Sequence, residues 1–500
     1  MVVRKRVPAR AAALRLLVVT ALAAVGFGLW LGSGSVVAVS TPPPVPRAHC
    51  GPGSMPETST QGRVPKADYD SGRAAKGYTC NTRQVAHQGA SGGFKVLRYR
   101  DAHGNTCAFY DSTLLIGRDV AYDLTNGNGL GVVVLDMNDP AHPHKTANLI
   151  TPTMLTPHES LLLNQRRGLL VAEMGTAATL PGVLAVYDVR TDCRHPKLLS
   201  QSLGGLTGHE SGFTEDGRTF WISGTVDGLY AVDLTDPRHP QRIFEQHGVR
   251  YHGMRLSADG RTLYAAYIGD PGPGGITGAG LRILDVSQVQ ERRTNPSVSV
   301  LATLRWNGAS IPQVAEPFTR DGHRYLLEVD EFVDLFSFSG LTNVAEAPVG
   351  AARIINVDDP RHPWVVSDIR LKVHQPDQRT GPQKNDPGAG FPAQGYAAHY
   401  CSLPTRDDPK IAGCSMILSG LRLFDIRDVE HPKEIGYFNR PATRKSGLGG
   451  LTSVTLPDRL GGYAMSAPAW DRKRGQVWYS DANSGFYVVQ LTNGIGSLLR

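Results

Sequence analysis

Four histidines stand at comparable places along the chain and could bind a metal ion. His209 and His252 each precede an Asp-Gly dipeptide by the same number of residues, and His158 and His399 occupy similar places in their own segments. Neutral imidazoles that converge with a carboxylate suit zinc, copper or iron, and an open coordination position would allow Lewis-acid or hydrolytic chemistry. We therefore predict that His158, His209, His252 and His399 are the ligands of a transition-metal site.

An acidic residue directly follows two of these histidines, Glu159 after His158 and Glu210 after His209. Both glutamates are candidates for groups that support the metal ligands without binding the ion. Neighbouring residues in a strand point to opposite faces, so we expect Glu159 and Glu210 to turn away from the histidines and bond neighbouring segments.

The alternative is that the four histidines only hydrogen-bond backbone groups and water. Metal binding needs neutral imidazoles, so metal affinity should fall below about pH 6.5, the unperturbed histidine pKa. Metal binding also needs the histidine side chains to converge on one point. The hypothesis fails unless nitrogens of at least three of these side chains come within roughly 5–6 Å, because metal–nitrogen bonds are short.

Other recurring polar residues are better explained as turn formers. Each of five aspartates stands where an apolar run enters a turn, and there a carboxylate accepts backbone N–H groups. A second set of histidines stands in His-Pro dipeptides a few residues later. The aspartates are Asp136, Asp188, Asp233, Asp285 and Asp425, and the histidines are His142, His195, His239, His362 and His431.

These residues belong to a repeated element that consists of glycine, an apolar run and aspartate, usually followed by Asp-Pro and His-Pro. It occurs seven times, as GVVVLDMNDPAHP (131–143), GVLAVYDVRTDCRHP (182–196), GLYAVDLTDPRHP (228–240), GLRILDVSQV (280–289), AARIINVDDPRHP (351–363), GLRLFDIRDVEHP (420–432) and GFYVVQLTNG (485–494). Around the third copy, residues 209–245 read as four short strands separated by turn signals. Such a sheet needs cover on both faces, and neighbouring copies supply it.

The pattern predicts an all-β chain, a seven-bladed β-propeller of four-stranded antiparallel blades over residues 80–495. Sequence before the first complete copy, and a last copy without an outer strand, indicate closure by N- and C-terminal strands. The first strand of each blade should line the central channel, so the four histidines gather at one axial mouth. The loops between second and third strands open there too, and they hold Glu173, Asp227, Asp270, Asp330, Glu331 and Asp481.

The copies GLRILDVS, GLYAVDLTDPRHP and GLRLFDIRD resemble the LVIVD repeat, which is named for its apolar-Asp core. From about Cys50 to Leu491 the chain is similar to the secreted LVIVD-repeat proteins of high-GC Gram-positive bacteria. That resemblance implies a β-propeller and no particular activity. The fourth copy departs from the repeat because it lacks His-Pro, and the seventh has Gln490 in place of aspartate.

The first 40 residues have the features of a secretory signal peptide. Five basic residues and no acid precede an apolar run and then small residues. Cleavage near Ala38 is expected, and an uncleaved membrane anchor is the alternative. Residues 41–79 form a Pro/Gly-rich arm.

Removing the signal lowers the formal net charge from +7 to about +2. No basic stripe with interleaved aromatic residues remains, so we expect no nucleic-acid partner. Membrane contact is expected only through an uncleaved N-terminal segment, and the protein should be a monomer.

All six cysteines follow the signal segment, and an even number in an exported protein predicts disulfides. Six cysteines allow 15 pairings. We expect Cys80–Cys107 and Cys401–Cys414, which would close short loops, and Cys50–Cys193 from the remainder.

Two classes of function fit these features. The first is a binding or scaffold module, at the cell envelope or outside the cell, that presents the axial mouth to an unknown ligand or partner. The second is a metal-dependent oxidase or hydrolase that uses the same mouth. No HExxH helix or phosphate-binding glycine loop is present in the sequence.

Overall fold

The computed structural model describes most of the chain after the predicted signal segment. The described residues are 41–112, 129–175, 181–206, 208–224, 227–272, 275–306, 310–332, 349–387, 395–441 and 462–500. Residues 1–40, the predicted signal peptide, lie outside them.

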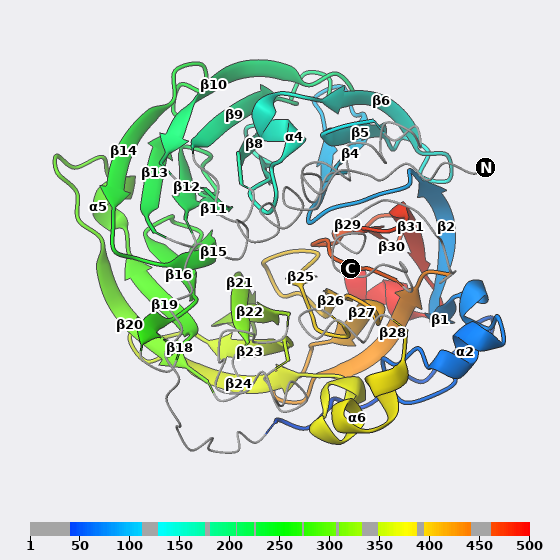
Figure 1. Cartoon of the computed structure of the whole chain (residues 1–500). Coiled ribbons are helices and arrows are strands. Elements are labelled where there is room, and N and C mark those ends of the chain that lie inside the picture. The colour runs from blue at the N-terminus through cyan, green and yellow to red at the C-terminus, as the bar shows by residue number, and fades with distance from the viewer. Residues whose placement is uncertain are drawn as a thin grey trace, which may run out of the picture.

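Seven small antiparallel sheets stand in a ring around a central axis, which confirms the predicted seven-bladed β-propeller (Figure 1). Within five of the sheets the strands pair in chain order, while an N-terminal strand is added at the outer edge of each of the other two.

The first four blades are complete within continuous stretches of chain. Blade 1 is β3 (Val96–Arg100), β4 (Thr106–Asp111), β5 (Val132–Asp136) and β6 (His144–Leu149). Blade 2 is β7 (Leu162–Asn164), β8 (Leu169–Glu173), β9 (Gly182–Asp188) and β10 (Lys197–Gly205). Blade 3 is β11 (Glu210–Phe213), β12 (Thr219–Ser223), β13 (Leu229–Asp233) and β14 (Gln241–Gln246). Blade 4 is β15 (Tyr251–Leu256), β16 (Thr262–Tyr267), β19 (Gly280–Asp285) and β20 (Ser299–Arg305), with the small hairpin β17 (Asp270–Gly272) and β18 (Gly275–Thr277).

Blade 5 is also continuous in the chain, whereas blades 6 and 7 each include a strand from the N-terminal part of the chain. Blade 5 is β21 (Ile311–Arg320), β22 (His323–Glu331), β23 (Ala352–Asn356) and β24 (Trp364–Ile369). Blade 6 is β25 (Tyr400–Ser402), β26 (Ile411–Met416), β27 (Gly420–Asp425) and β28 (Lys433–Asn439), with β1 (Tyr78–Cys80) as a fifth strand. Blade 7 is β29 (Ala469–Asp471), β30 (Gln476–Asp481), β31 (Gly485–Leu491) and β2 (Thr82–Gln88).

Helices are few and short. They are α2 (Lys66–Asp70), α4 (Pro152–Leu155), α5 (Ser287–Gln290), α6 (Pro376–Thr380), and the 3-10 turns η1 (Ala74–Lys76), η3 (Lys372–His374), η4 (Pro382–Asn385) and η5 (Ile495–Leu499). Among the described residues, no helix has the length and apolar character needed to cross a membrane.

The repeated element is the third strand of every blade, and its apolar residues fill the spaces between neighbouring sheets. Between blades 2 and 3, for example, Val171 and Val186 pack with Phe220 and Val232 in one buried cluster. Each sheet thus buries both faces, which explains runs of consecutive apolar residues in place of strict alternation.

The ring closes as predicted, with an N-terminal strand completing the last blade. β2 pairs antiparallel with β31, so that Thr82 lies opposite Leu491 and Gln88 opposite Phe486. A ladder of backbone hydrogen bonds therefore joins the strand that follows the arm to the last strand of the chain.

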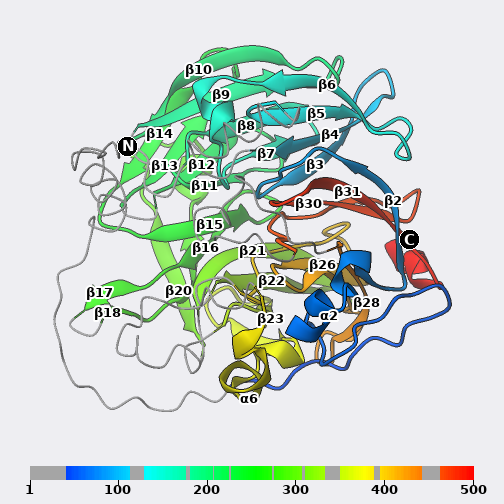
Figure 2. The ribbon, with the colours of Figure 1, turned by 45° about the vertical axis from the view of Figure 1, so that its right-hand side comes forward.

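The arm, residues 41–79, runs along blades 5 and 6, and its helix α2 lies near β28 and α6 (Figures 1 and 2). The N–H of Val45 donates to the carbonyl of Arg370 at 2.9 Å. Arg422 of β27 is fully buried and pairs with Glu57 of the arm and with Glu434 of β28. The arm is therefore a packed part of the propeller.

The structure contains three disulfides, and two of our three predicted pairs are wrong. The bonds are Cys50–Cys80, Cys107–Cys193 and Cys401–Cys414, of which only the last was predicted. Short loop length favoured Cys80–Cys107, but Cys80 lies on blade 6 beside the arm while Cys107 lies on blade 1 facing the turn after β9. The disulfides therefore join cysteines that the packing of the arm and blades brings together.

The aspartates and His-Pro histidines form turns on one face of the ring, as predicted. The carboxylates of Asp136, Asp188, Asp233, Asp285 and Asp425 each accept the backbone N–H two residues later, at 2.7–3.0 Å. Four of the histidines, His142, His239, His362 and His431, contact the aspartate three residues earlier through Nδ1 and are exposed.

Candidate metal centre

The four candidate ligands come from four blades and meet on the axis. His209 directly precedes β11, and His399 directly precedes β25. His252 is the second residue of β15 and so lies inside the strand. His158 stands in the turn between α4 and β7 with φ of 49°, a left-handed conformation that is uncommon for a residue with a side chain. All four histidines are buried.

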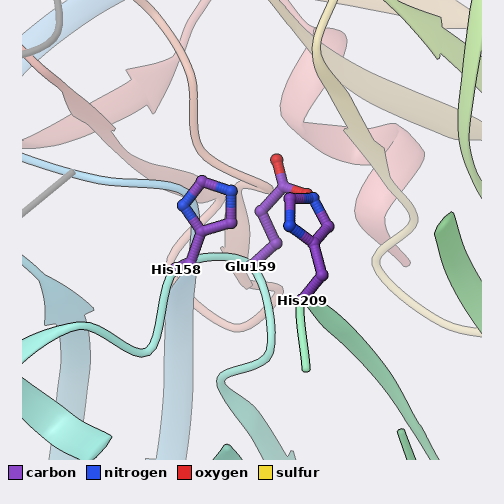
Figure 3. A group of neighbouring side chains, drawn as sticks. All are labelled: His158, Glu159 and His209. Carbon is purple, nitrogen blue, oxygen red and sulfur yellow. The ribbon is translucent and has the colours of Figure 1, made fainter. Parts of the chain in front are cut away.

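Neighbouring rings of this set lie close to one another. The Nε2 atoms of His209 and His252 are 2.9 Å apart, and the ring centroids of His158 and His209 are 4.6 Å apart. Nitrogen and oxygen atoms of His158, Glu159 and His209 all lie within 4.8 Å of one another. Figure 3 shows these three side chains facing the same space. Neighbouring imidazoles therefore lie close together in pairs, His158 with His209 and His209 with His252.

The carboxylate of Glu159 lies at the middle of the cluster. Its Oε2 is 3.2 Å from His209 Nε2 and 3.4 Å from His252 Nε2, and its Oε1 is 3.2 Å from His399 Nε2. We predicted that Glu159 would turn away, and this is wrong. The prediction assumed strand alternation, whereas His158 and Glu159 belong to a turn in which the left-handed residue redirects the chain.

Glu210 does lie in a strand, and it is directed away from the histidines. It pairs with Lys95 at 3.2 Å and with Arg255 at 3.6 Å, and Tyr400 donates to it. These partners belong to blades 1, 4 and 6, so Glu210 ties blades together across the channel.

Blade 5 supplies two groups that we did not name as site residues. Glu331, at the end of β22, lies 3.0 Å from His399 Nε2 and 3.4 Å from His252 Nε2. Gln313 of β21 donates from its amide to Glu159 Oε1 at 2.8 Å. Glu331 was among the carboxylates expected at the mouth, but nothing in its local sequence separates it from the other five.

Those other acids have different surroundings. Asp330 pairs with buried Arg353, Asp227 contacts exposed His247, and Asp481 pairs with Arg440. The carboxylates of Glu159 and Glu331 contact the histidine rings, and buried Glu173 lies against the backbone of His209.

Backbone carbonyls orient two of the imidazoles. Nδ1 of His399 lies 2.8 Å from the carbonyl oxygen of Met465, and Nδ1 of His252 lies 3.3 Å from that of Gln313. A carbonyl only accepts, so these Nδ1 atoms carry the hydrogen and direct Nε2 to the axis. The same arrangement fixes metal-bound histidines in proteins.

Burial and neighbouring charges perturb the titration of the cluster. Burial lowers the pKa of His158 to about 3, and the charge of His209 adds to the effect. Burial also lowers the pKa of His252 to about 3. Burial acts in the same direction on His399, but Glu159 and Glu331 outweigh it and raise its pKa to about 9. Burial raises the pKa of Glu159, yet the surrounding imidazoles, His252 foremost, lower it well below its usual value. His158 and His252 are therefore neutral near pH 7, whereas the two carboxylates favour a protonated His399.

Sequence and structure comparisons place the chain only at the level of its fold. No family model matches the sequence, and no curated protein matches it. Hydrazine synthase from Kuenenia stuttgartiensis aligns over 81% of this chain and 97% of its own, with 12% identity and a TM-score of 0.47. A Bacteroides fragilis protein described as a 6-phosphogluconolactonase covers 73% and 90%, with 11% identity and a TM-score of 0.43.

A chain of the mitotic checkpoint complex is similar to the same extent, with 9% identity and a TM-score of 0.45 over 82% of this chain and 95% of that one. Likeness this distant carries nothing about activity. The strand pairing and the axial cluster define the class instead: a seven-bladed propeller with histidines and carboxylates on its axis. A fold of this class supports a generic binding or scaffold role.

Proposed function

We propose that this protein is a propeller that binds one transition-metal ion at its axial mouth. The observation that carries the proposal is the approach of His209, His252 and His399 to one carboxylate, that of Glu159, through their Nε2 atoms. His158 completes the set from a strained turn, and strain of this kind is found where function requires it.

The spacing of the donor atoms supports an ion at the centre. Ligands of a tetrahedral zinc ion lie about 3.3 Å apart when each bond is about 2.0–2.1 Å long. The separations between imidazole nitrogens and carboxylate oxygens here are 3.0–3.4 Å. Only small movements would let an ion enter.

The donor atoms narrow the choice of metal. All six cysteines form disulfides, so the donors are imidazole nitrogen and carboxylate oxygen. This set suits zinc, copper or iron. When bound, such an ion supplies a Lewis acid at the mouth.

Elemental analysis of protein purified without a histidine tag tests the proposal. We expect about one zinc, copper or iron ion per chain, and strong loss of that metal in the H209A/H252A double variant. A matched control is H142A/H239A, which removes two exposed turn histidines and should leave the metal content unchanged. Wild-type protein that stays metal-free after incubation with all three ions would contradict metal binding and favour the scaffold role.

We further infer that the protein is exported and belongs with the secreted LVIVD-repeat proteins. Three disulfides support an oxidising compartment, and the coincidence of the repeated element with every third strand supports the repeat. Mass spectrometry of protein recovered outside the cell should find an N-terminus near residue 40. Full-length protein confined to the cytoplasm would contradict export.

A further inference from the structure

A pocket lined by arginines lies between blades 2 and 3, at the face opposite the axial mouth. Its volume is about 380 Å³, and its lining includes Arg166, Arg167, Arg190 and Arg238 but a single acid, Asp188. These residues stand in the turn between β7 and β8, in the turn after β9, and in the turn between β13 and β14. Such turns lie at the ends of the strands away from the four axial histidines.

Three of the arginines make no side-chain hydrogen bond and no ion pair within the described part of the chain. They are Arg166, Arg190 and Arg238, and all three are exposed. Asp188 is close by, but its carboxylate accepts the backbone N–H of Arg190. The pocket therefore holds an excess of positive charge.

Arg167 is positioned by backbone groups of blade 3. Its guanidinium donates to the carbonyl oxygens of Gly217 at 2.7 Å, Leu234 at 2.6 Å and Thr235 at 3.2 Å. None of these acceptors carries a full negative charge. A partly buried cation held in this way remains available to an anion in the pocket.

Elsewhere on the same face, arginines are neutralised by carboxylates. Arg194 pairs with Asp192 at 2.8 Å, Arg292 with Asp233 at 2.9 Å, and Arg427 with Asp425 at 2.8 Å. Arg194, in the same turn of blade 2 as Arg190, is thus paired, whereas the arginines that line the pocket are not paired with a carboxylate of the described ranges.

We propose that this pocket binds a phosphate or sulfate group. Guanidinium groups bind such oxyanions through two parallel hydrogen bonds, which a spherical halide cannot accept. The group can be a free anion or an ester on a larger molecule. The pocket shares no residue with the axial centre, so this proposal is independent of the metal site.

Isothermal titration calorimetry at constant ionic strength tests the pocket with inorganic phosphate, inorganic sulfate and glycerol phosphate. Constant ionic strength matters because salt screens exposed charges. We expect saturable binding of oxyanion at one site per chain and no matching signal from sodium chloride. Tighter binding of glycerol phosphate than of inorganic phosphate would identify an ester as the source, and the reverse order a free anion.

Matched variants distinguish binding at this pocket from nonspecific attraction of anions to positive charge. R166A/R190A/R238A should weaken phosphate binding at least tenfold, and the corresponding triple lysine variant should lie between it and wild type because it keeps charge but loses the fork. The control R83A/R100A/R361A removes three exposed arginines from other places and should bind like wild type. Arg167 is left unchanged because it supports blade 3. No oxyanion binding by wild type, or equal weakening in the control, would overturn the proposal.

Discussion

Glu159 contacts more of the candidate ligands than any other single side chain of the axial cluster. It approaches three imidazoles and also accepts the amide of Gln313, while its backbone follows His158 in a strained turn. One carboxylate therefore organises groups from blades 2, 3, 4, 5 and 6. The negative charge of Glu159 attracts protonated imidazoles, and it would attract a metal cation in the same way.

E159Q replaces this carboxylate by an amide of nearly equal size and removes its charge. We expect metal affinity to fall about 10–100-fold, the usual range for groups that support metal ligands. Competition with a chromophoric chelator measures the change. E430Q, at an exposed turn, is the control and should retain wild-type affinity. An unchanged affinity in E159Q would show that the ion does not sit among these imidazoles.

At the scale of the elements, the turn after the third strand shows why the recurring aspartates stabilise the blades. Asp233 accepts the backbone N–H of Thr235 and two hydrogen bonds from Arg292, which lies just after α5. Burial raises the pKa of Asp233, but the bonds from Arg292 and Thr235 outweigh it and lower the pKa to about 2. The ionised carboxylate therefore joins blade 3 to the segment that follows blade 4's third strand.

D233N should make the protein less stable at neutral pH and less sensitive to acid. The folded-state pKa lies below the unfolded value of about 3.9, so the stabilisation is present above that pH and is lost as pH falls towards 2. We expect a loss of about 1–2 kcal/mol at pH 7, allowing for partial exposure. D188N is the control, since Asp188 accepts a turn N–H but forms no ion pair with an arginine among the described residues. Urea unfolding between pH 2.5 and 7 gives the difference, and parallel curves for D233N and wild type would contradict it.

Some elements were predictable from sequence because their signals are local. A repeated apolar run identifies the third strand of each blade, and a common spacing to Asp-Gly identifies His209 and His252. Glu331 and Gln313 carry no such signal, because blade 5 brings them to the axis only when the ring closes. Glu159 was placed wrongly because a turn was treated as a strand. Cys50–Cys80 and Cys107–Cys193 depend on packing between segments that loop length does not describe.

In the whole molecule, a strand pairing and a disulfide hold the ring together. β2 pairs with β31 to close it, and Cys107–Cys193 links blade 1 to blade 2. The axial centre depends on both, because its ligands come from different blades and no two of them form a local pair. Opening the ring would separate the groups that converge on the axis.

Removing Cys107–Cys193 should cost more stability than removing Cys401–Cys414. The first spans 86 residues and the second 13, and a longer loop loses more unfolded-state entropy when it is closed. We expect C107A/C193A to lose about 2–4 kcal/mol and C401A/C414A to lose less, by denaturant unfolding. The reverse ranking would mean that the inter-blade bond adds little to ring closure.

Anomalous X-ray diffraction from crystals of the metal-loaded protein, collected on both sides of the absorption edge of the bound element, would locate the ion. We expect one strong peak on the propeller axis, with Nε2 atoms of His209, His252 and His399 about 2.0–2.2 Å from it and His158 directed to it. A peak bound only by exposed rim histidines, or an axis without one in protein that carries stoichiometric metal, would contradict the proposed axial site.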